Sequence, residues 1–166
     1  MTTIRTALLE HVGASNFRAS TGTGRRIDFG DVALGALSPV ETLLAALGAC
    51  TAMDVISIAV KKRQAIVDYR IHVRGDQRDD YPQVFTAIDV IHEVAGVDIS
   101  EAAIRRSIEL SATKYCPVSA MISAGATTVH HRYQIHSTGT RTYEADGEVI
   151  VTGPYARPDV VAVSGS

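Results

Sequence analysis

The pattern of hydrophobic positions predicts one long helix flanked by segments that alternate like β-strands. Residues 40–60 are apolar on nearly every helical face, and a helix that is apolar all round is buried on all sides. The run Ser38-Pro39-Val40-Glu41 predicts where this helix begins. Ser38 can cap the helix, Pro39 suits the first helical position, and Glu41 completes an S-x-x-E capping box.

The length of this helix points beyond a single chain. If it extends to Arg63, it is about 37 Å long, because each residue adds roughly 1.5 Å. A chain of 166 residues is too small to surround such a helix alone. We therefore expect a central helix that is wrapped by a sheet and by a partner subunit.

Period-two alternation predicts strands on both sides of the helix. Before it, short strands are expected at residues 3–12, 17–20 and 25–29. After it, residues 69–74, 84–94 and 129–136 alternate apolar and polar positions. The predicted inward faces are Val84, Ile88 and Val90 in the second of these strands, and Val129, His131, Tyr133 and Ile135 in the third.

Glycines are interpreted as breaks between the strands. Residues 75–82 are expected to form a charged turn, Gly96 to end a strand, and Asp146-Gly147 to form a turn between two strands. The last ten or so residues, rich in Gly and Ser, are expected to be poorly ordered.

A second helix is predicted from Ser100, with a buried stripe made of Ile104, Ser107, Ile108 and Ser111. The run Tyr115-Cys116-Pro117-Val118 then breaks and restarts the chain, with Pro117 at the first position of a new helix and Cys116 as its N-cap. The order β, long helix, β, helix, β predicts an α+β fold.

Composition narrows the class of protein. A hydrophobic content of 46% with 20% charged residues is typical of a soluble globular chain. The formal net charge is -2 and the longest basic run is Lys61-Lys62-Arg63, which suits a helix C-terminus better than a nucleic-acid interface. Glu41 and Asp54 interrupt the apolar segment, so no membrane span is expected. With no recognisable signal peptide at the start, a cytoplasmic protein is expected, and disulfides there are rarely structural.

The two cysteines are the strongest candidates for chemistry. Cys50 lies in the middle of the predicted helix, beside Gly48 and other small residues that leave room for close approach. The alternative is that Cys50 is a small buried hydrophobe in a tight helix crossing. Cys116, at a helix N-cap and two residues after Lys114, is expected to be a reactive thiolate. The six histidines are scattered, so neither a metal site nor a cofactor is predicted.

Two motifs around these cysteines resemble the OsmC/Ohr family. The first is Ser38-Pro39 followed by residues 43–55, which include Leu47-Gly48-Ala49-Cys50-Thr51-Ala52. The second is Lys114-Tyr115-Cys116-Pro117-Val118-Ser119. The resemblance implies an OsmC-like fold in which antiparallel sheets wrap around long central helices in an intertwined homodimer. The resemblance covers roughly residues 17–129. The OsmC-like domain is expected to span residues 1–137, and residues 138–166 are expected to form a partly ordered C-terminal extension that could cover the cleft, extend the sheet or dangle.

By that resemblance, the protein reduces organic hydroperoxides in oxidative-stress defence. Cys50 would attack the peroxide and become a sulfenic acid, and Cys116 would resolve this acid as a disulfide. An external dithiol would then reduce the disulfide.

Three features bear on this function. Peroxidases of the family carry a glutamate directly after the proline of the helix start, where this chain has Val40. They also need an arginine that stabilises the thiolate, and the candidates are Arg18, Arg25 and Arg26. Asp54 lies one helical turn beyond Cys50 and would raise the pKa of its thiol. These features leave open an alternative, an OsmC-fold redox-sensing or ligand-binding protein without efficient peroxidase turnover.

Overall fold

The structure is a computed structural model that describes residues 3–151 and 162–164. The chain forms two compact units that divide between Leu43 and Leu44, and each unit is described by itself. Helix α1 (Pro39–Lys61) crosses this division, so most of its residues belong to the second unit. Most of the last ten residues, which were expected to be poorly ordered, lie outside the described residues.

The first unit is a three-stranded antiparallel sheet. Its strands are β1 (Ala7–Gly13), β2 (Asn16–Thr21) and β3 (Arg26–Phe29), which confirm the three predicted strands, and they lie in the order of the chain. A short 3-10 helix, η1 (Val32–Leu34), follows them. Ala19 is the one buried side chain among the described residues of this unit. The unit therefore has almost no core of its own.

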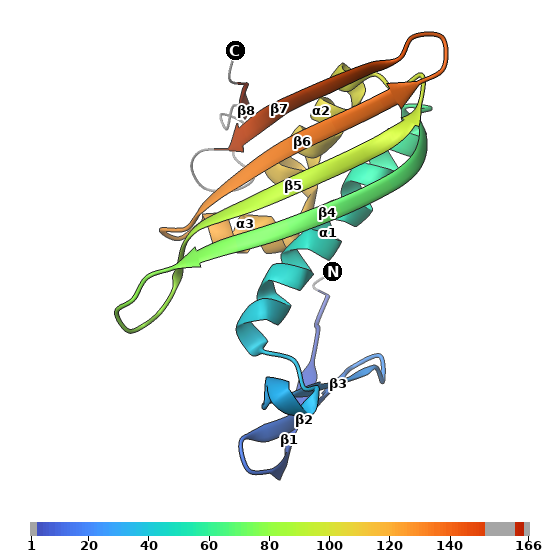
Figure 1. Ribbon diagram of the computed structural model, residues 1–166. Coiled ribbons are helices and arrows are strands. Elements are labelled where there is room, and N and C mark those ends of the chain that lie inside the picture. The colour runs from blue at the N-terminus through green and yellow to red at the C-terminus, as the bar shows by residue number, and fades with distance from the viewer. Residues whose placement is uncertain (1–2, 152–161, 165–166) are drawn as a thin grey trace. The chain divides into compact units, whose positions relative to one another are not determined.

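The second unit is a five-stranded sheet with helices on one face (Figure 1). The strands follow one another across the sheet as β4 (Ala65–Gln77), β5 (Phe85–Val97), β6 (Thr128–Thr138), β7 (Tyr143–Val151) and β8 (Ala162–Ser164). Helices α1, α2 (Glu101–Leu110) and α3 (Pro117–Ser123) cover the face, and a π-helical turn, η2 (Ser111–Tyr115), joins α2 to α3. The α+β prediction is confirmed.

The sheet departs from the antiparallel expectation in one pair of strands. Strands β5 and β6 run parallel, whereas the other neighbouring pairs of the sheet are antiparallel. A parallel pair needs a long crossover, because the chain must return to the end from which it started. Helices α2 and α3 form that crossover. Beyond Ser137, β7 pairs with β6, so this part of the chain extends the sheet.

The ends of α1 follow the predicted signals. Ser38 Oγ accepts a hydrogen bond from the Glu41 N–H at 3.5 Å, which is the first half of the capping box. The helix ends at Lys61, and Arg63 adopts a left-handed φ of 57° that lets the Gln64 N–H donate to the Ala59 carbonyl. The basic run thus lies at the helix C-terminus, as expected.

One stripe of α1 is buried, not the whole circumference. The buried residues are Leu47, Gly48, Thr51, Val55 and Ala59. On another face Met53 is 74% exposed and Val60 is 62% exposed. The helix is long and apolar enough to cross a membrane by length and composition, but its buried stripe packs into the core of the second unit.

Gly48 explains how closely α1 lies on the sheet. A Cβ at this position would lie 2.9 Å from Val73 Cγ2 and 3.7 Å from Ile71 Cγ2, both on β4. Glycine in mid-helix costs roughly 1 kcal/mol relative to alanine. That cost is offset here because the helix backbone can rest directly on β4.

The three glycines interpreted as breaks lie inside strands instead. Gly75 is in β4, Gly96 in β5 and Gly147 in β7. Each leaves space for atoms that a Cβ would strike. These are the Phe85 ring at Gly75, the Ala65 carbonyl and the Ile99 side chain at Gly96, and the Tyr133 ring at Gly147. A glycine inside a strand often marks such a close approach. The predicted turn at Asp146-Gly147 is therefore wrong, because β7 runs through it. The turn predicted at residues 75–82 is present but begins only after Gln77, and the strand predicted to end at Gly96 ends one residue later, at Val97.

The core has two hydrophobic clusters. One holds Val55 and Ala59 of α1 with Ile104 and Ile108 of α2 and Val94 of β5. The other is formed by Leu47, Phe85, Ile88, Val90, Cys116 and Val129. The predicted inward faces of β5 and β6 are confirmed except at Val84, which is 49% exposed and precedes the strand.

A polar layer separates the two clusters. Thr51 lies between Leu47 and Val55 along α1, and His92 lies between Val90 and Val94 along β5. Both are fully buried, and so are His131 of β6 and the serines Ser107 and Ser111. The sequence pattern placed His131 on the inward face but did not identify His92.

The two buried histidines are linked in a chain of hydrogen bonds. Tyr69 Oη lies 2.6 Å from His92 Nδ1, and His92 Nε2 lies 3.3 Å from His131 Nδ1. Burial raises the pKa of Tyr69 and lowers the pKa of His92 and His131, so all three groups are uncharged near neutral pH. The Nε2 atom of His131 is buried and has no protein partner among the described residues.

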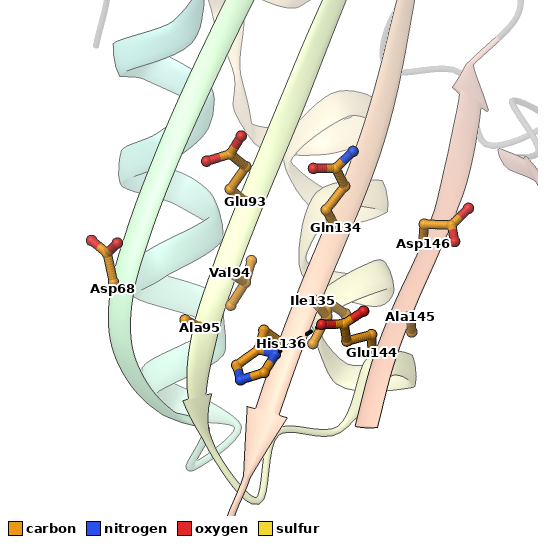
Figure 2. A pocket seen from close by; sticks show the side chains of 10 residues that line it. All are labelled: Asp68, Glu93, Val94, Ala95, Gln134, Ile135, His136, Glu144, Ala145 and Asp146. Atoms are coloured by element: carbon orange, nitrogen blue, oxygen red, sulfur yellow. Dashed lines mark hydrogen bonds and ion pairs between the residues drawn. The ribbon is translucent and has the colours of Figure 1, made fainter. Parts of the chain in front are cut away.

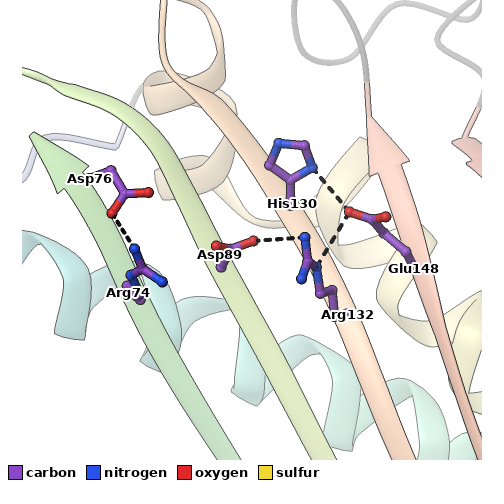
Figure 3. Close-up of polar contacts among 6 residues, drawn as sticks. All are labelled: Arg74, Asp76, Asp89, His130, Arg132 and Glu148. Atoms are coloured by element: carbon purple, nitrogen blue, oxygen red, sulfur yellow. Dashed lines mark hydrogen bonds and ion pairs between the residues drawn. The ribbon is translucent and has the colours of Figure 1, made fainter.

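The opposite face of the sheet is polar. Arg132 lies between Asp89 at 3.5 Å and Glu148 at 3.6 Å, and Glu148 also pairs with His130 at 3.0 Å (Figure 3). Such solvent-exposed pairs contribute at most about 1 kcal/mol each. The register of the sheet is therefore set mainly by the apolar side chains on the face that the helices cover.

The buried histidines predict acid lability. Burial, then the neighbouring His131, lowers the pKa of His92, and burial, then His130, lowers the pKa of His131 to about 4. The unfolded chain takes up these protons near the ordinary pKa of about 6.5 while the folded chain does not. Stability is therefore lost as pH falls from 6.5 towards 4, by on the order of 3 kcal/mol for His131.

Urea unfolding at pH 7 and pH 4.5 measures this loss. His131→Gln, which keeps an acceptor for His92, should lose less stability between the two pH values than the wild type does. His72→Gln, at an exposed position on β4, should lose as much as the wild type. Equal losses in wild type and His131→Gln would contradict the prediction.

Candidate functional site

The second unit brings Cys50 and Cys116 together. The two sulfur atoms and a carboxylate oxygen of Asp54 all lie within 4.8 Å of one another. Both cysteines are reduced thiols, Cys50 partly buried and Cys116 buried. The two residues are 66 positions apart in the sequence (116 − 50), so the fold alone creates this proximity.

Helix α1 sets the positions of two members of the site. Cys50 and Asp54 are four residues apart, which places them on one face of a helix. The Ser111 hydroxyl, from the π-helical turn η2, donates a hydrogen bond to Asp54 Oδ2 at 3.0 Å. The carboxylate is thereby held against the segment that carries Cys116.

Cys116 is the N-cap of α3, as the sequence predicted. Its backbone is extended, with φ -74° and ψ 104°, and its Sγ accepts a hydrogen bond from the Ser119 N–H at 3.3 Å. Thr51 Oγ1 donates to the same sulfur at 3.6 Å. The Cys116 N–H donates to the Ser111 carbonyl at 2.9 Å, which closes the π-helical turn. The sulfur is thus fixed by contacts from both α1 and α3.

The surroundings of Cys50 favour the neutral thiol. Burial is the largest cause that raises its pKa, followed by a hydrogen bond with the Cys116 thiol, and the pKa rises to about 11. The Asp54 charge raises it further, in the direction that the sequence predicted, whereas the Val118 N–H lowers it. No cation of the chain's described part is among the groups that set this pKa. The sequence identified Asp54 but not the larger effect of burial.

The three arginine candidates belong to the first unit. Arg18 donates to Asp28 across β2 and β3, at 2.8 Å from Nε and 3.0 Å from Nη2. Arg25 and Arg26 are exposed. Their role as thiolate-stabilising groups stays a prediction.

A pocket of about 380 Å³ opens beside Cys116. It is lined by Ala112, Thr113, Lys114, Tyr115, Cys116, Pro117, Ala120 and Met121. The Lys114 ammonium lies 5.4 Å from the centre of the Tyr115 ring, and both Tyr115 and Met121 are exposed. The pocket combines a basic side chain with apolar walls, and Cys116 is part of its lining.

A second pocket, of about 530 Å³, has a different character (Figure 2). It lies along β4, β5, β6 and β7, and its lining includes the acids Asp68, Glu93, Glu144 and Asp146. His136 pairs with Glu144 at 3.3 Å on this polar face. No thiol lines this pocket.

The comparisons with known proteins define the family. A family profile described as OsmC-like protein matches residues 30–132, more than half of the chain. The chain therefore belongs to the OsmC family. It is 40% identical to the protein YhfA of Escherichia coli K12 over 98 residues, which are 59% of this chain and 72% of that protein.

Solved structures share the fold. A hypothetical protein from Aquifex aeolicus VF5 is 27% identical, with a TM-score of 0.73 over 82% of this chain and 99% of that one. The organic hydroperoxide resistance protein OsmC from Legionella pneumophila is 17% identical, with a TM-score of 0.56 over 78% and 95%. At that identity the Legionella protein establishes likeness of fold alone.

Asp54→Asn should make Cys50 more reactive. The substitution removes a negative charge beside the thiol and so lowers the pKa of Cys50, while burial, the larger cause, remains. In a Cys116→Ser background, alkylation by iodoacetamide at pH 8 should accelerate by up to about threefold, because the Asp54 charge is the smallest of the causes and a whole pKa unit would be a tenfold change in thiolate. The exposed Asp80 provides the control, Asp80→Asn, which should leave the rate unchanged. A slower or unaltered rate in Asp54→Asn would show that its charge does not act on Cys50.

Proposed function

We propose that this protein is a thiol-dependent reductant of organic hydroperoxides that uses Cys50 and Cys116 in oxidative-stress defence. Membership of the OsmC family supports a redox or peroxide-related role, as do neighbours of the same fold that are described as hydroperoxide resistance proteins. The observation that carries the proposal is the approach of the two reduced sulfurs to within 4.8 Å.

The proposed reaction proceeds in three steps. The Cys50 thiolate attacks the terminal oxygen of the hydroperoxide; an S–O bond forms, the O–O bond breaks, and the alkoxide leaves as an alcohol after it takes up a proton. Cys116 then attacks the Cys50 sulfenic acid, a disulfide forms, and the hydroxyl leaves as water. An external dithiol reduces the disulfide and restores both thiols.

A homodimer would complete this site. Ala46, Ala49, Met53 and Val60 lie on an exposed, largely apolar stripe of α1. An uncovered apolar stripe of this kind is typical of an interaction surface. The first unit, with almost no core of its own, also needs a surface on which to pack, because three strands are stable only when an apolar face is covered. A second copy of the chain satisfies both needs.

The dimer would also explain substrate choice and activation. Covering the exposed stripe of α1 surrounds the Cys50 region with apolar side chains, which favours alkyl over hydrogen peroxide. Arg18, Arg25 and Arg26 remain the candidates for the positive charge that would stabilise the Cys50 thiolate. The chemistry needs reducing conditions to regenerate the thiols, which suits a cytoplasmic location.

A second candidate function rests on the pKa of Cys50. A thiol with a pKa near 11 is mostly protonated at pH 7, and the thiolate is the nucleophile. Val40, at the position where peroxidases of the family carry a glutamate, also argues against efficient peroxidase turnover. On this reading the two cysteines form a redox sensor or line a ligand site, with slow oxidation and no efficient turnover.

Consumption of cumene hydroperoxide with dihydrolipoamide separates the two functions. The proposed function predicts catalytic turnover that is abolished in Cys50→Ser. In the absence of the dithiol, Cys116→Ser should consume about one equivalent of peroxide and then stop, because no thiol remains to reduce the Cys50 sulfenic acid. The rate should rise by up to about tenfold per pH unit from 7 to 9 if the Cys50 thiolate stays scarce. Disulfide formation without turnover would favour the sensor, and full activity of Cys50→Ser would refute the two-cysteine mechanism.

Light scattering at micromolar concentration tests the dimer. The wild type should have twice the mass of its 17.7 kDa chain. Met53→Glu, which places a charge on the exposed stripe, should shift the protein towards monomer, whereas Arg70→Glu on the exposed surface of β4 should not. A monomeric wild type would contradict the proposal.

A further inference from the structure

We infer that Cys50, Cys116 and Asp54 together bind one soft divalent metal ion, such as Zn²⁺ or Cd²⁺, when both cysteines are reduced. The inference concerns the same side chains as the proposed peroxide chemistry but does not depend on that chemistry. It stands on the geometry of three ligand atoms, on their chemical type and on the contacts that hold them.

The distances fit a metal site that needs only a small contraction. Zn²⁺ binds thiolate sulfur at about 2.3 Å and carboxylate oxygen at about 2.0–2.2 Å in a tetrahedral arrangement. Neighbouring ligand atoms of such a tetrahedron are therefore separated by roughly 3.5–3.8 Å. The three atoms here lie within 4.8 Å of one another without an ion. Side-chain rotations that move each ligand atom by up to about 1 Å would bring the three atoms to the spacing of a metal site.

The donor types select a soft ion. Two thiolates with one carboxylate suit Zn²⁺ or Cd²⁺, whereas Mg²⁺ and Ca²⁺ prefer oxygen ligands alone. Cys50 and Asp54 stand at positions i and i+4 of α1, a spacing at which two ligands on one helix can reach the same ion. Cys116 approaches from a different element, so the ion would join α1 to α3.

Neighbouring groups hold two of the three ligands in place by hydrogen bonds. Ser111 donates to Asp54 Oδ2, which orients the carboxylate and leaves a further oxygen to bind the ion. Thr51 and the Ser119 N–H both donate to the Cys116 sulfur. Such outer contacts orient the ligands of protein metal sites and tune their affinity.

The charge of the site favours a cation. Asp54 and two thiolates would place three negative charges within 4.8 Å of one another, and a divalent ion bound between them would largely neutralise these charges. The fourth position of the ion would face solvent or the pocket beside Cys116, as in sites that keep three protein ligands and one exchangeable one.

A bound ion and a Cys50–Cys116 disulfide exclude each other. Both thiolates are needed as ligands, and a disulfide removes them. Metal binding would therefore protect the reduced pair from oxidation, and oxidation would release the ion.

Titration of the reduced, metal-free protein with Cd²⁺ and Zn²⁺ tests the inference. We expect one ion per chain, release of about two protons because two thiols ionise, and a cadmium–thiolate charge-transfer absorption for two sulfurs. Cys50→Ser and Cys116→Ser should each weaken binding by at least about 100-fold, and Asp54→Asn by about tenfold, since even an outer contact of a metal site contributes 10- to 100-fold. One equivalent of Zn²⁺ should also slow alkylation of both thiols.

Controls separate this site from adventitious binding. His136→Gln and Asp76→Asn remove exposed groups that could bind metal elsewhere, and both variants should retain wild-type affinity. Wild-type protein that is alkylated at both thiols keeps its other metal-binding groups, and it should no longer bind the ion. Three outcomes would each contradict the site as described. They are metal binding that survives in the Cys50→Ser/Cys116→Ser variant, a stoichiometry of half an ion per chain, and an unchanged metal affinity in Asp54→Asn. None of these measurements uses a peroxide. If the protein fails to turn over cumene hydroperoxide, the metal-binding result is therefore unaffected.

Discussion

The contact between α1 and β4 at Gly48 determines where the chemistry of this protein can occur. Because Gly48 has no Cβ, the helix backbone lies against Val73, and the stripe from Leu47 to Ala59 enters the core. Cys50 follows two residues later and is therefore held at the margin of that stripe, only partly buried. A larger residue at position 48 would push the helix outward and carry both Cys50 and Asp54 away from Cys116.

The parallel pairing of β5 and β6 brings the second cysteine to the first. A parallel pair requires the chain to cross one face of the sheet, and here the crossover consists of α2, the π-helical turn and α3. That face is the one against which α1 packs. The topology thus places the N-cap of α3 beside α1, and Thr51 of α1 contacts the Cys116 sulfur directly.

Local chemistry made much of this fold predictable from the sequence. The start of α1, the Ser100 and Cys116 caps and the inward face of β6 follow from short-range patterns, and all are observed. Glycine misled the prediction, because a glycine that makes room for Tyr133 and a glycine that forms a turn have the same local sequence signature. The buried His92 and the raised pKa of Cys50 depend on what packs around them, which no local pattern contains.

The three ligand-type groups of the site cannot all be ionised without a compensating cation. With Cys50 and Cys116 as thiolates and Asp54 as a carboxylate, three negative charges would lie within 4.8 Å, and the protein instead keeps Cys50 protonated through burial and its neighbours. A guanidinium group would favour a single reactive thiolate, because it stabilises the charge without occupying the sulfur. A soft metal ion would stabilise both thiolates but coordinate them. On the two proposals, the nature of the cation that enters this site would therefore decide whether the cysteine pair attacks a peroxide or retains a metal.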